Sequence, residues 1–235
     1  MIGALGMDGG KGVIVTGASS GLGKAVVENL LRKNYQVFGI DKQPASIEHE
    51  FYTHALVDLS EFSTATLAPI PNWYGFIHCA GVSTGGRISE MEIEDWDYSM
   101  SVNVTSAMKI CKLASSEMID FGRIVLVGSP VSIAGANKPS YSASKAALHG
   151  LTMSLSRTFG KRNITVNTVL PGPMITGMTE DWSKEKRQSV ALQNRLNRLA
   201  KTSEVAHVIC SMIDEEWSFM SASIVDLTCG SLYGH

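Results

Sequence analysis

The chain has no marked excess of either charge and no long apolar run. Its 235 residues carry 20 Lys and Arg against 22 Asp and Glu, so we expect neither a nucleic-acid partner nor an anionic-membrane partner. No apolar stretch approaches the roughly 18 residues that indicate a transmembrane helix. Residues 1–10 lack the basic and apolar regions of a signal peptide, and we therefore expect a cytoplasmic protein.

Cysteine and histidine form no recognisable ligand pattern. The four cysteines include no C-x-x-C, and Cys79, Cys111 and Cys210 lie in apolar segments, where a free thiol packs as a small core residue. The six histidines are scattered along the chain. We therefore expect a reducing compartment, with no disulfide and no metal site.

What the sequence does contain is a regular alternation of β-rich and helix-periodic segments. Seven strands that alternate with helices predict an α/β fold, in which one doubly wound, mostly parallel sheet has helices on both faces. The length suits a single domain over 1–235. The predicted strands are 13–16, 36–40, 55–58, 74–78, 123–128, 164–170 and 223–227.

A glycine-rich turn connects the first strand to the first helix. From Gly17 to Gly23 the spacing is G-x-x-x-G-x-G, which differs from the widespread G-x-G-x-x-G dinucleotide fingerprint. Glycines let the backbone approach a ligand, and the free N–H groups at a helix start attract anions. The glycines alone would be a weak signal, but their strand–turn–helix context predicts a phosphate site.

Acidic residues follow the second and third strands. Asp41 lies about 20 residues after the glycine-rich turn, where a carboxylate can accept from a ribose diol. Its charge would repel a 2′-phosphate and so favours NAD over NADP, although the neighbouring Lys42 could partly tolerate that phosphate. The alternative is a solvated strand-end acid. Asp58 either contacts adenine or starts the next helix as its N-cap.

Tyr141 and Lys145 are four residues apart at the start of a predicted helix and therefore share one face. A nearby ammonium lowers the pKa of a phenol, ordinarily about 10, and such a tyrosine can act as a general acid or base on a ketone or alcohol. The alternative is an ordinary amphipathic helix with an exposed lysine and a half-buried tyrosine. Ser129, after the fifth strand, either lies at the same sheet edge or is only a turn residue.

Two further segments are unusual for their predicted structure. Asn103 stands inside a helical pattern over 91–119, where asparagine is unfavourable. It either distorts the helix and frees a backbone carbonyl for water, or it faces solvent. Residues 174–200, with Met174, Met178 and Trp182, predict a mobile lid over a pocket or a surface helical arm.

In this order, the motifs resemble those of the short-chain dehydrogenase/reductase family, in its compact single-domain branch. The resemblance covers about residues 11–230 and implies a Rossmann-type fold. It also implies hydride transfer between a nicotinamide cofactor and a ketone or secondary alcohol. The matching motifs are Thr16-Gly17-x-x-x-Gly21-x-Gly23, Ala80-Gly81, Asn103, Ser129 with Tyr141-x-x-x-Lys145, and Pro171-Gly172.

The resemblance implies a role for each matched residue. Tyr141 would be the general acid in reduction and the base in oxidation, while Lys145 would lower its pKa and bind the nicotinamide ribose. Ser129 would hold the substrate oxygen, and Asn103 would bind a water that links Lys145 to solvent. NAD(H) is favoured over NADP(H) as the cofactor. The residues implied at the cofactor are Thr16, Gly17, Ser19, Ser20, Gly21, Leu22, Gly23, Asp41, Asp58, Ala80, Gly81, Tyr141, Lys145, Pro171, Gly172 and, at the carboxamide, Thr176.

Several positions depart from the family pattern. His78 and Cys79 replace the two asparagines of N-N-A-G, which predicts weaker support for the central sheet. The interval between Ser129 and Tyr141 is about one residue short, residues 58–78 are compressed, and Thr228-Cys229-Gly230 replaces D-G-G.

We expect from this an NAD(H)-dependent oxidoreductase that acts on a small carbonyl or alcohol. One alternative is a non-catalytic dinucleotide-binding regulatory protein, and another is an epimerase or dehydratase with internal hydride transfer. The C-terminal half resembles 3-oxoacyl-carrier-protein reductases, which suggests fatty-acid or secondary metabolism. The resemblance also implies a homotetramer or homodimer built on the helices at 91–119 and 139–160.

Overall fold

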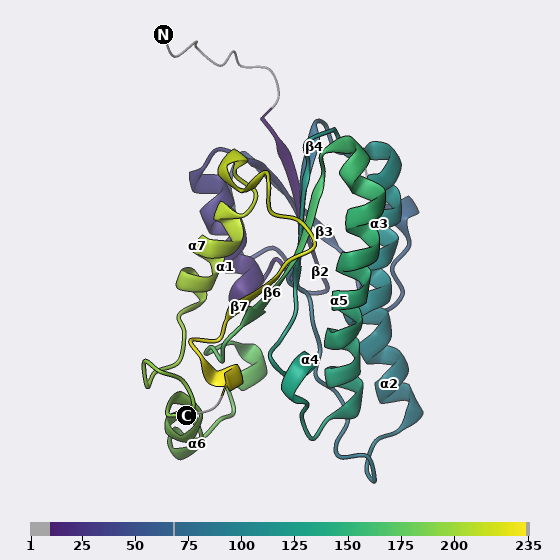
Figure 1. The fold of residues 1–235 in the computed structure, drawn as a ribbon. Helices are drawn as coiled ribbons and strands as arrows, with labels where there is room; N and C mark the ends of the chain where they lie inside the picture. The colour runs from purple at the N-terminus through teal and green to yellow at the C-terminus, as the bar shows by residue number, and fades with distance from the viewer. Residues whose placement is uncertain (1–9, 68, 234–235) are drawn as a thin grey trace.

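The computed structural model describes residues 10–67 and 69–233. Within them, one sheet of seven parallel strands has the order β3-β2-β1-β4-β5-β6-β7, with helices on both faces (Figure 1). The predicted doubly wound fold is therefore confirmed. The strand order reverses between β1 and β4, where such folds bind ligands. The strands are β1 (Gly12–Thr16), β2 (Gln36–Asp41), β3 (Tyr52–Leu56), β4 (Trp73–His78), β5 (Arg123–Val127), β6 (Thr165–Pro171) and β7 (Ile224–Leu227).

The helices form a layer on each face of the sheet (Figure 1). One layer consists of α1 (Gly21–Arg32) and α7 (Thr202–Ser211). The other consists of α2 (Ile93–Met100), α3 (Ser106–Glu117) and α5 (Pro139–Phe159). The short helices α4 (Val131–Ala134) and α6 (Lys184–Ala191) lie beyond the carboxyl ends of the strands. Short 3₁₀ turns occur at Thr64–Thr66, Gly160–Arg162, Gly177–Thr179, Glu215–Trp217 and Ser231–Tyr233.

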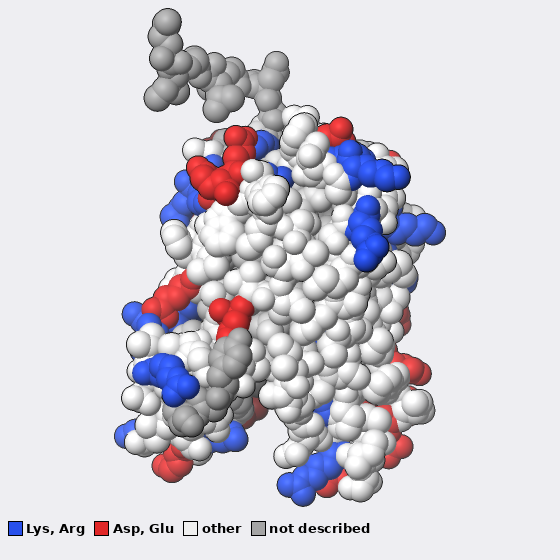
Figure 2. Space-filling view, in the orientation of Figure 1, with Lys and Arg blue, Asp and Glu red and all other residues white. Residues whose placement is uncertain are grey.

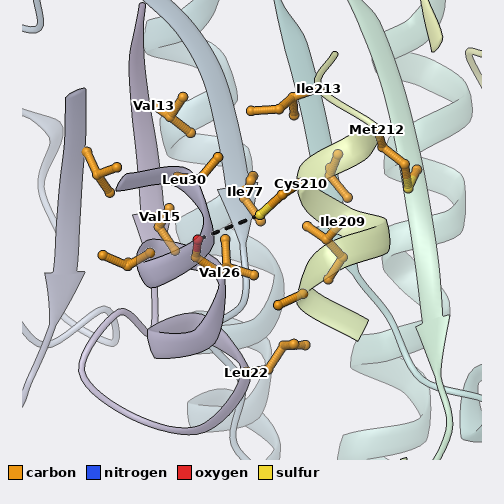
Figure 3. Packing of buried hydrophobic residues seen from close by; sticks show 14 of the residues in the cluster. Val13, Val15, Leu22, Val26, Leu30, Ile77, Ile209, Cys210, Met212 and Ile213 are labelled. Carbon is orange, nitrogen blue, oxygen red and sulfur yellow. Dashed lines mark hydrogen bonds between the residues drawn. The ribbon is translucent and has the colours of Figure 1, made fainter. Parts of the chain in front are cut away.

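Successive side chains of a strand point to opposite faces of the sheet, so each strand contributes to two hydrophobic cores. Val13 and Val15 of β1 pack under α1 and α7, whereas Ile14 points into the core on the opposite face. Each such fully buried side chain contributes about 1.5–3 kcal/mol. Figure 3 shows Cys210 of α7 directed at α1, with its Sγ 3.6 Å from the carbonyl oxygen of Val26. These contacts hold the first helix, and thus the turn before it, against the sheet.

The structure corrects one predicted strand, one predicted helix and one of the two roles considered for Asp58. β3 begins at Tyr52 and ends at Leu56, whereas the prediction was 55–58. The helix predicted over 91–119 is interrupted by a π-helical turn, Ser101–Thr105. Between Asp58 and β4, the described residues contain only the 3₁₀ turn Thr64–Thr66, as the compressed stretch predicted. Asp58 therefore starts no helix, and its carboxylate accepts instead from the amide of Ser60 at 2.9 Å.

Residues 174–200 form one excursion between β6 and α7. It contains the 3₁₀ turn Gly177–Thr179 and α6. Its two ends are tied together, because the amide of Ala200 donates to the carbonyl of Pro173 at 3.0 Å and Met174 forms a β-bridge with Ala200. The side chain of Met178 and residues 1–9 lie outside the described part of the chain. The mobility of this segment stays a prediction.

The four cysteines, all within the described residues, are free thiols. Cys111 and Cys210 are buried, Cys79 is half-buried and Cys229 is exposed. Among residues 10–67 and 69–233, His, Cys, Asp and Glu side chains form no group of three or more that could hold a metal ion. No helix in the same part of the chain is long and apolar enough to cross a membrane.

Candidate active site

The carboxyl ends of the strands meet at the lower edge of the molecule in Figure 1, and the surface is hollowed there. Figure 2 shows a notch between the lobe that carries α6 and the lobe that carries α2 and α4. Strands β1, β2, β4 and β5 deliver to this edge the glycine-rich turn, Asp41, Ala80 and Ser129 respectively. The predicted site residues therefore converge from segments that are distant in sequence.

The glycine-rich turn packs directly against the end of β4. Gly17 has a φ of 69°, which favours glycine, and a β-carbon there would lie 2.9 Å from the amide nitrogen of Ala80. A β-carbon on Gly23 would overlap the carbonyl oxygen of Gly17. The backbone atoms of the first turn of α1 and of the glycine-rich turn thus lie in direct contact, with no room for a side chain between them. Any bulkier residue would push the helix start away from the notch.

The start of α1 fits a dinucleotide phosphate. Ser20 is its N-cap residue but makes no side-chain capping hydrogen bond, and the first turn carries no acid. The first amides of a helix have no intrahelical acceptor, so those of this turn suit an anionic ligand. Leu22 is buried in the core beneath α1, which leaves only its backbone for such a ligand. Thr176 lies beside this turn, because a β-carbon on Gly21 would be 3.3 Å from its Cγ2.

Asp41 is held against the glycine-rich turn by hydrogen bonds. Its carboxylate accepts from the amide of Ser19 at 3.0 Å and from the amide of Gln43 at 2.9 Å. The Ser19 hydroxyl donates in turn to the carbonyl of Gln43 at 3.2 Å. The Asp41 carboxylate is therefore held in place at the glycine-rich turn and is not merely a solvated acid at a strand end. Both donors of Ser19 are used within the protein.

Lys42 and Asp58 lie near the same end of the sheet. The Lys42 ammonium donates to the phenol oxygen of Tyr98, on α2, at 3.2 Å. Hydrogen bonds from Ser60, together with the charge of Lys42, lower the pKa of the Asp58 carboxyl. Asp58 is exposed, and its predicted contact with adenine stays a prediction.

Lys145 lies on the inner side of α5 and is only 3% exposed, so the alternative of an exposed surface lysine is wrong. Its ammonium donates to the carbonyl of Val127, the last residue of β5, at 2.8 Å. It lies 6.0 Å from the centre of the Tyr141 ring and 3.0 Å from where a β-carbon on Gly81 would stand. The Ala80-Gly81 turn and the Tyr141–Lys145 pair therefore border one space.

The electrostatics of the pair differ from the expectation. Burial raises the pKa of Tyr141, and hydrogen bonding with Ser129 opposes that rise only in part. The expected lowering by Lys145 is absent from the free protein, because the Lys145 ammonium is directed at Val127 and not at the phenol oxygen. Burial also lowers the pKa of Lys145 to about 8, so at neutral pH this side chain is still mainly an ammonium.

Asn103 is fully buried inside the π-helical turn, so it does not face solvent. The predicted distortion of the helix is present. Its side-chain oxygen accepts from the amide of Val82 at 2.8 Å, and its Nδ2 donates to the carbonyl of Val82 and to the hydroxyl of Ser144. Its own backbone carbonyl, expected to bind water, accepts from His78 Nε2 at 3.2 Å.

Pro171 and Gly172 lie at the end of β6, which is three strands away from β1 and its glycine-rich turn in the sheet. Pro171 is the last residue of the strand rather than the residue that stops it, and Gly172 donates its amide to Leu227 at 3.0 Å. The segment that carries Thr176 starts two residues later. These two residues therefore set where the excursion leaves the sheet.

Sequence reasoning missed two kinds of contact. His78 replaces an expected asparagine, but the sequence gave no hint that its ring contacts both Thr16 and Asn103. The imidazole thus makes two contacts where the family pattern has an asparagine, and the weaker support of the sheet stays a prediction. Ser144 could have been found from the sequence, because it stands three residues after Tyr141 on α5. Its hydroxyl donates to the backbone carbonyl of Tyr141 at 2.9 Å.

The buried state of His78 gives a prediction about stability. Burial, and then the charge of Lys145, lower its pKa to about 3, against about 6.5 when unfolded. Below pH 6.5 the unfolded chain gains a proton that the folded chain does not, so the stabilisation is full above that pH and is lost as pH falls. Between about pH 6 and pH 4, the wild-type free energy of unfolding should fall about 1.4 kcal/mol per pH unit more steeply than that of His78→Gln. Urea unfolding measures both slopes, and parallel slopes would contradict it.

A glycine-rich turn at a helix start that shares one sheet edge with a serine, a tyrosine and a buried lysine is the arrangement expected of a nicotinamide-dependent oxidoreductase. The chain belongs to the short-chain dehydrogenase family, whose model, described as short chain dehydrogenase, matches residues 11–187. It is an oxidoreductase of CH–OH groups, in a family that uses NAD(P)(H) and small-molecule substrates.

Known proteins similar to this chain agree with that class. The 3-oxoacyl-[acyl-carrier-protein] reductase FabG of Vibrio cholerae is 30% identical in an alignment 236 positions long that covers 94% of this chain and 97% of that protein. A short chain dehydrogenase family protein from Francisella tularensis has a TM-score of 0.85 at 28% identity, covering 95% of this chain and 99% of its own. The angucycline C-6 ketoreductase LanV, solved with bound NADP, has a TM-score of 0.85 at 25% identity and coverages of 96% and 97%.

Proposed function

We propose that this protein interconverts a ketone and a secondary alcohol with NAD(H), using Tyr141 as the general acid and base. One observation carries the proposal: Tyr141, its partner Ser129 and the buried Lys145 lie at the Ala80-Gly81 turn, against which the glycine-rich turn packs. A protein that only bound a dinucleotide would have no use for a buried lysine beside a tyrosine.

The roles of these side chains follow from their donors. A bound nicotinamide would supply or accept the hydride. In the reducing direction the Tyr141 hydroxyl gives its proton to the carbonyl oxygen, which the Ser129 hydroxyl holds by a hydrogen bond. The Lys145 ammonium stabilises the resulting phenolate by its charge. The raised pKa of Tyr141 in the free protein keeps the phenol protonated at neutral pH, as an acid must be.

The preference for NAD(H) is supported by the surroundings of Asp41. Its negative charge faces the turn, and the amide and hydroxyl of Ser19 are already engaged with Asp41 and Gln43. Neither donor of Ser19 is directed at a 2′-phosphate. The Lys42 ammonium donates to the phenol oxygen of Tyr98, and it remains close enough to Asp41 for the two charges to interact.

Asp41→Asn tests this preference. The amide keeps one oxygen acceptor for a neighbouring N–H but removes the charge that repels a 2′-phosphate, so kcat/KM with NADPH relative to NADH should rise at least about tenfold. Asp58→Asn makes the same change of charge at an exposed site and should leave the ratio unchanged. An unchanged ratio in Asp41→Asn would mean that Asp41 does not face the ribose.

A second candidate is reduction of a 3-oxoacyl thioester. It is favoured by the 30% identity to the FabG of Vibrio cholerae over nearly the whole chain. Both candidates use the same residues and differ only in the molecule that enters the notch. The non-catalytic alternative is excluded because the chain is an oxidoreductase by family, and an epimerase or dehydratase with internal hydride transfer is the remaining alternative.

The deciding experiment follows the loss of reduced-nicotinamide absorbance with NADH and NADPH separately. The substrates are β-keto thioesters, cyclic diketones and ketosteroids, and Tyr141→Phe is the blank. Faster turnover with NADH on any substrate supports the proposal, and preference for thioesters supports the second candidate. NADH binding without turnover of any of these substrates would contradict both the proposed function and the second candidate.

We further propose that the chain is one domain over 1–235 with a substrate lid at about 174–200, and that it works in the cytoplasm as a homodimer or homotetramer. Figure 2 shows a broad face over β7 and α5 with few charged side chains. Met108 of α3 and Met153 of α5 are each 41% exposed. Met153→Glu should therefore lower the molar mass measured by light scattering. An unchanged oligomer would exclude α5 from the interface.

A further inference from the structure

His78 has no role in the chemistry described above, yet it is fully buried between the glycine-rich turn and the π-helical turn. Its Nδ1 lies 2.8 Å from the hydroxyl oxygen of Thr16, and its Nε2 lies 3.2 Å from the carbonyl oxygen of Asn103. A carbonyl can only accept, so Nε2 carries the proton. Nδ1 of the neutral ring then accepts from Thr16.

The bonds of His78 belong to one continuous chain. At one end, the amide of Ala80 donates to the Thr16 hydroxyl, whose own proton goes to His78. At the other end, Asn103 donates to Ser144, and the Ser144 hydroxyl donates to the backbone carbonyl of Tyr141 at 2.9 Å. Each N–H or O–H group in this chain has one acceptor, and the second N–H of the Asn103 amide goes to the carbonyl of Val82. The direction of each bond is therefore fixed. The chain joins the cofactor turn to the helix that carries Tyr141 and Lys145.

We propose that His78 is a positioning residue that couples the end of β4, against which the glycine-rich turn packs, to α5 through its Nε2. Nδ1 accepts from Thr16 and so fixes the tautomer that leaves the proton on Nε2, which holds the carbonyl of Asn103 and thereby the amide group that contacts Ser144. The inference rests on the proposed binding of NADH at the turn. It assigns His78 no contact with substrate or cofactor.

Two substitutions separate the two ring nitrogens. In His78→Asn the carboxamide ends as far from the backbone as Nδ1, so it can accept from Thr16 but cannot reach Asn103. In His78→Gln the amide nitrogen reaches as far as Nε2, so it can donate to Asn103 but leaves Thr16 without its acceptor. A residue that only fills space would respond to both changes alike.

The first measurement needs no turnover. NADH should slow hydrogen exchange of the Val82 amide, which donates to Asn103, at least threefold in the wild type and in His78→Gln. His78→Asn should still bind NADH, measured by its fluorescence, but should lose that protection. Equal protection in both variants, or none in the wild type although NADH binds, would overturn the coupling. A wild type that binds no NADH would instead overturn the proposed function.

Two further measurements complete the test. With a substrate that is turned over, His78→Asn should lose at least tenfold in kcat with its NADH dissociation constant within threefold, and His78→Gln should recover most of that kcat. Equal losses of kcat in the two variants would overturn the proposal. In ¹⁵N-histidine spectra at pH 7, with His78→Gln used for assignment, His78 should show a neutral ring protonated at Nε2. A ring protonated at Nδ1 would also overturn it.

Discussion

Tyr141→Phe is expected to lower kcat by about 10²–10⁴-fold, because it removes the hydroxyl that we assign to proton transfer and leaves the ring in place. The NADH dissociation constant should stay within a few-fold. The phenyl ring keeps the packing of α5 beside Lys145, whose ammonium bonds the carbonyl of Val127 and not the phenol. Steady-state rates and a fluorescence titration with NADH measure the two effects.

Tyr74→Phe is the matched control. It removes a buried hydroxyl that donates to the carbonyl of Ile213 at 2.7 Å, at the start of β4 and away from the notch. It should cost about 1 kcal/mol of stability and leave kcat unchanged below the melting temperature. Comparable turnover in Tyr141→Phe and the wild type would contradict the assignment of Tyr141 as general acid and base.

Gly23→Ala is expected to weaken NADH binding at least about 100-fold. Its methyl group would overlap the carbonyl oxygen of Gly17, and Gly17 cannot retreat, because it already packs against the amide of Ala80. The start of α1 must move, which should also lower the free energy of unfolding by about 1–3 kcal/mol. NADH titration and urea unfolding measure the two losses.

Gly160→Ala makes the same chemical change where there is room. Gly160 has right-handed helical backbone angles, and within the described part of the chain a β-carbon there meets no atom within 4 Å. We expect this variant to be more stable by about 0.4–1 kcal/mol, with NADH binding unchanged. Wild-type affinity for NADH in Gly23→Ala would show that the turn does not hold the cofactor.

The features that the sequence predicted well are local or repeat along the chain. The order of strands and helices follows from residue periodicity, and the position of the glycine-rich turn follows from its own backbone needs. β3 was misplaced because it is an edge strand, paired with β2 on one side, so Tyr52 and His54 can be partly exposed and its pattern is weak.

The features that the sequence could not predict depend on distant neighbours. The spacing of Tyr141 and Lys145 placed them on one helix face, but it could not show that the fold buries Lys145 almost completely while Tyr141 stays partly exposed. The acceptor of Lys145, a carbonyl of β5, is invisible in a linear pattern. Asn103 was recognised as unfavourable in a helix, whereas its bond to His78 joins residues 25 positions apart.

The hydrogen bond between Ala200 and Pro173 and the β-bridge between Met174 and Ala200 hold the two ends of the segment 174–200 together. Lengthening a loop whose ends are already held together costs little entropy, about 0.6 kcal/mol for each doubling of its length. Insertions, deletions or exchanges beyond Thr176, which lies beside Gly21, can therefore reshape what enters the notch without disturbing the sheet or the glycine-rich turn. In evolution, substitutions in this segment can therefore change the substrate specificity while the catalytic residues stay the same.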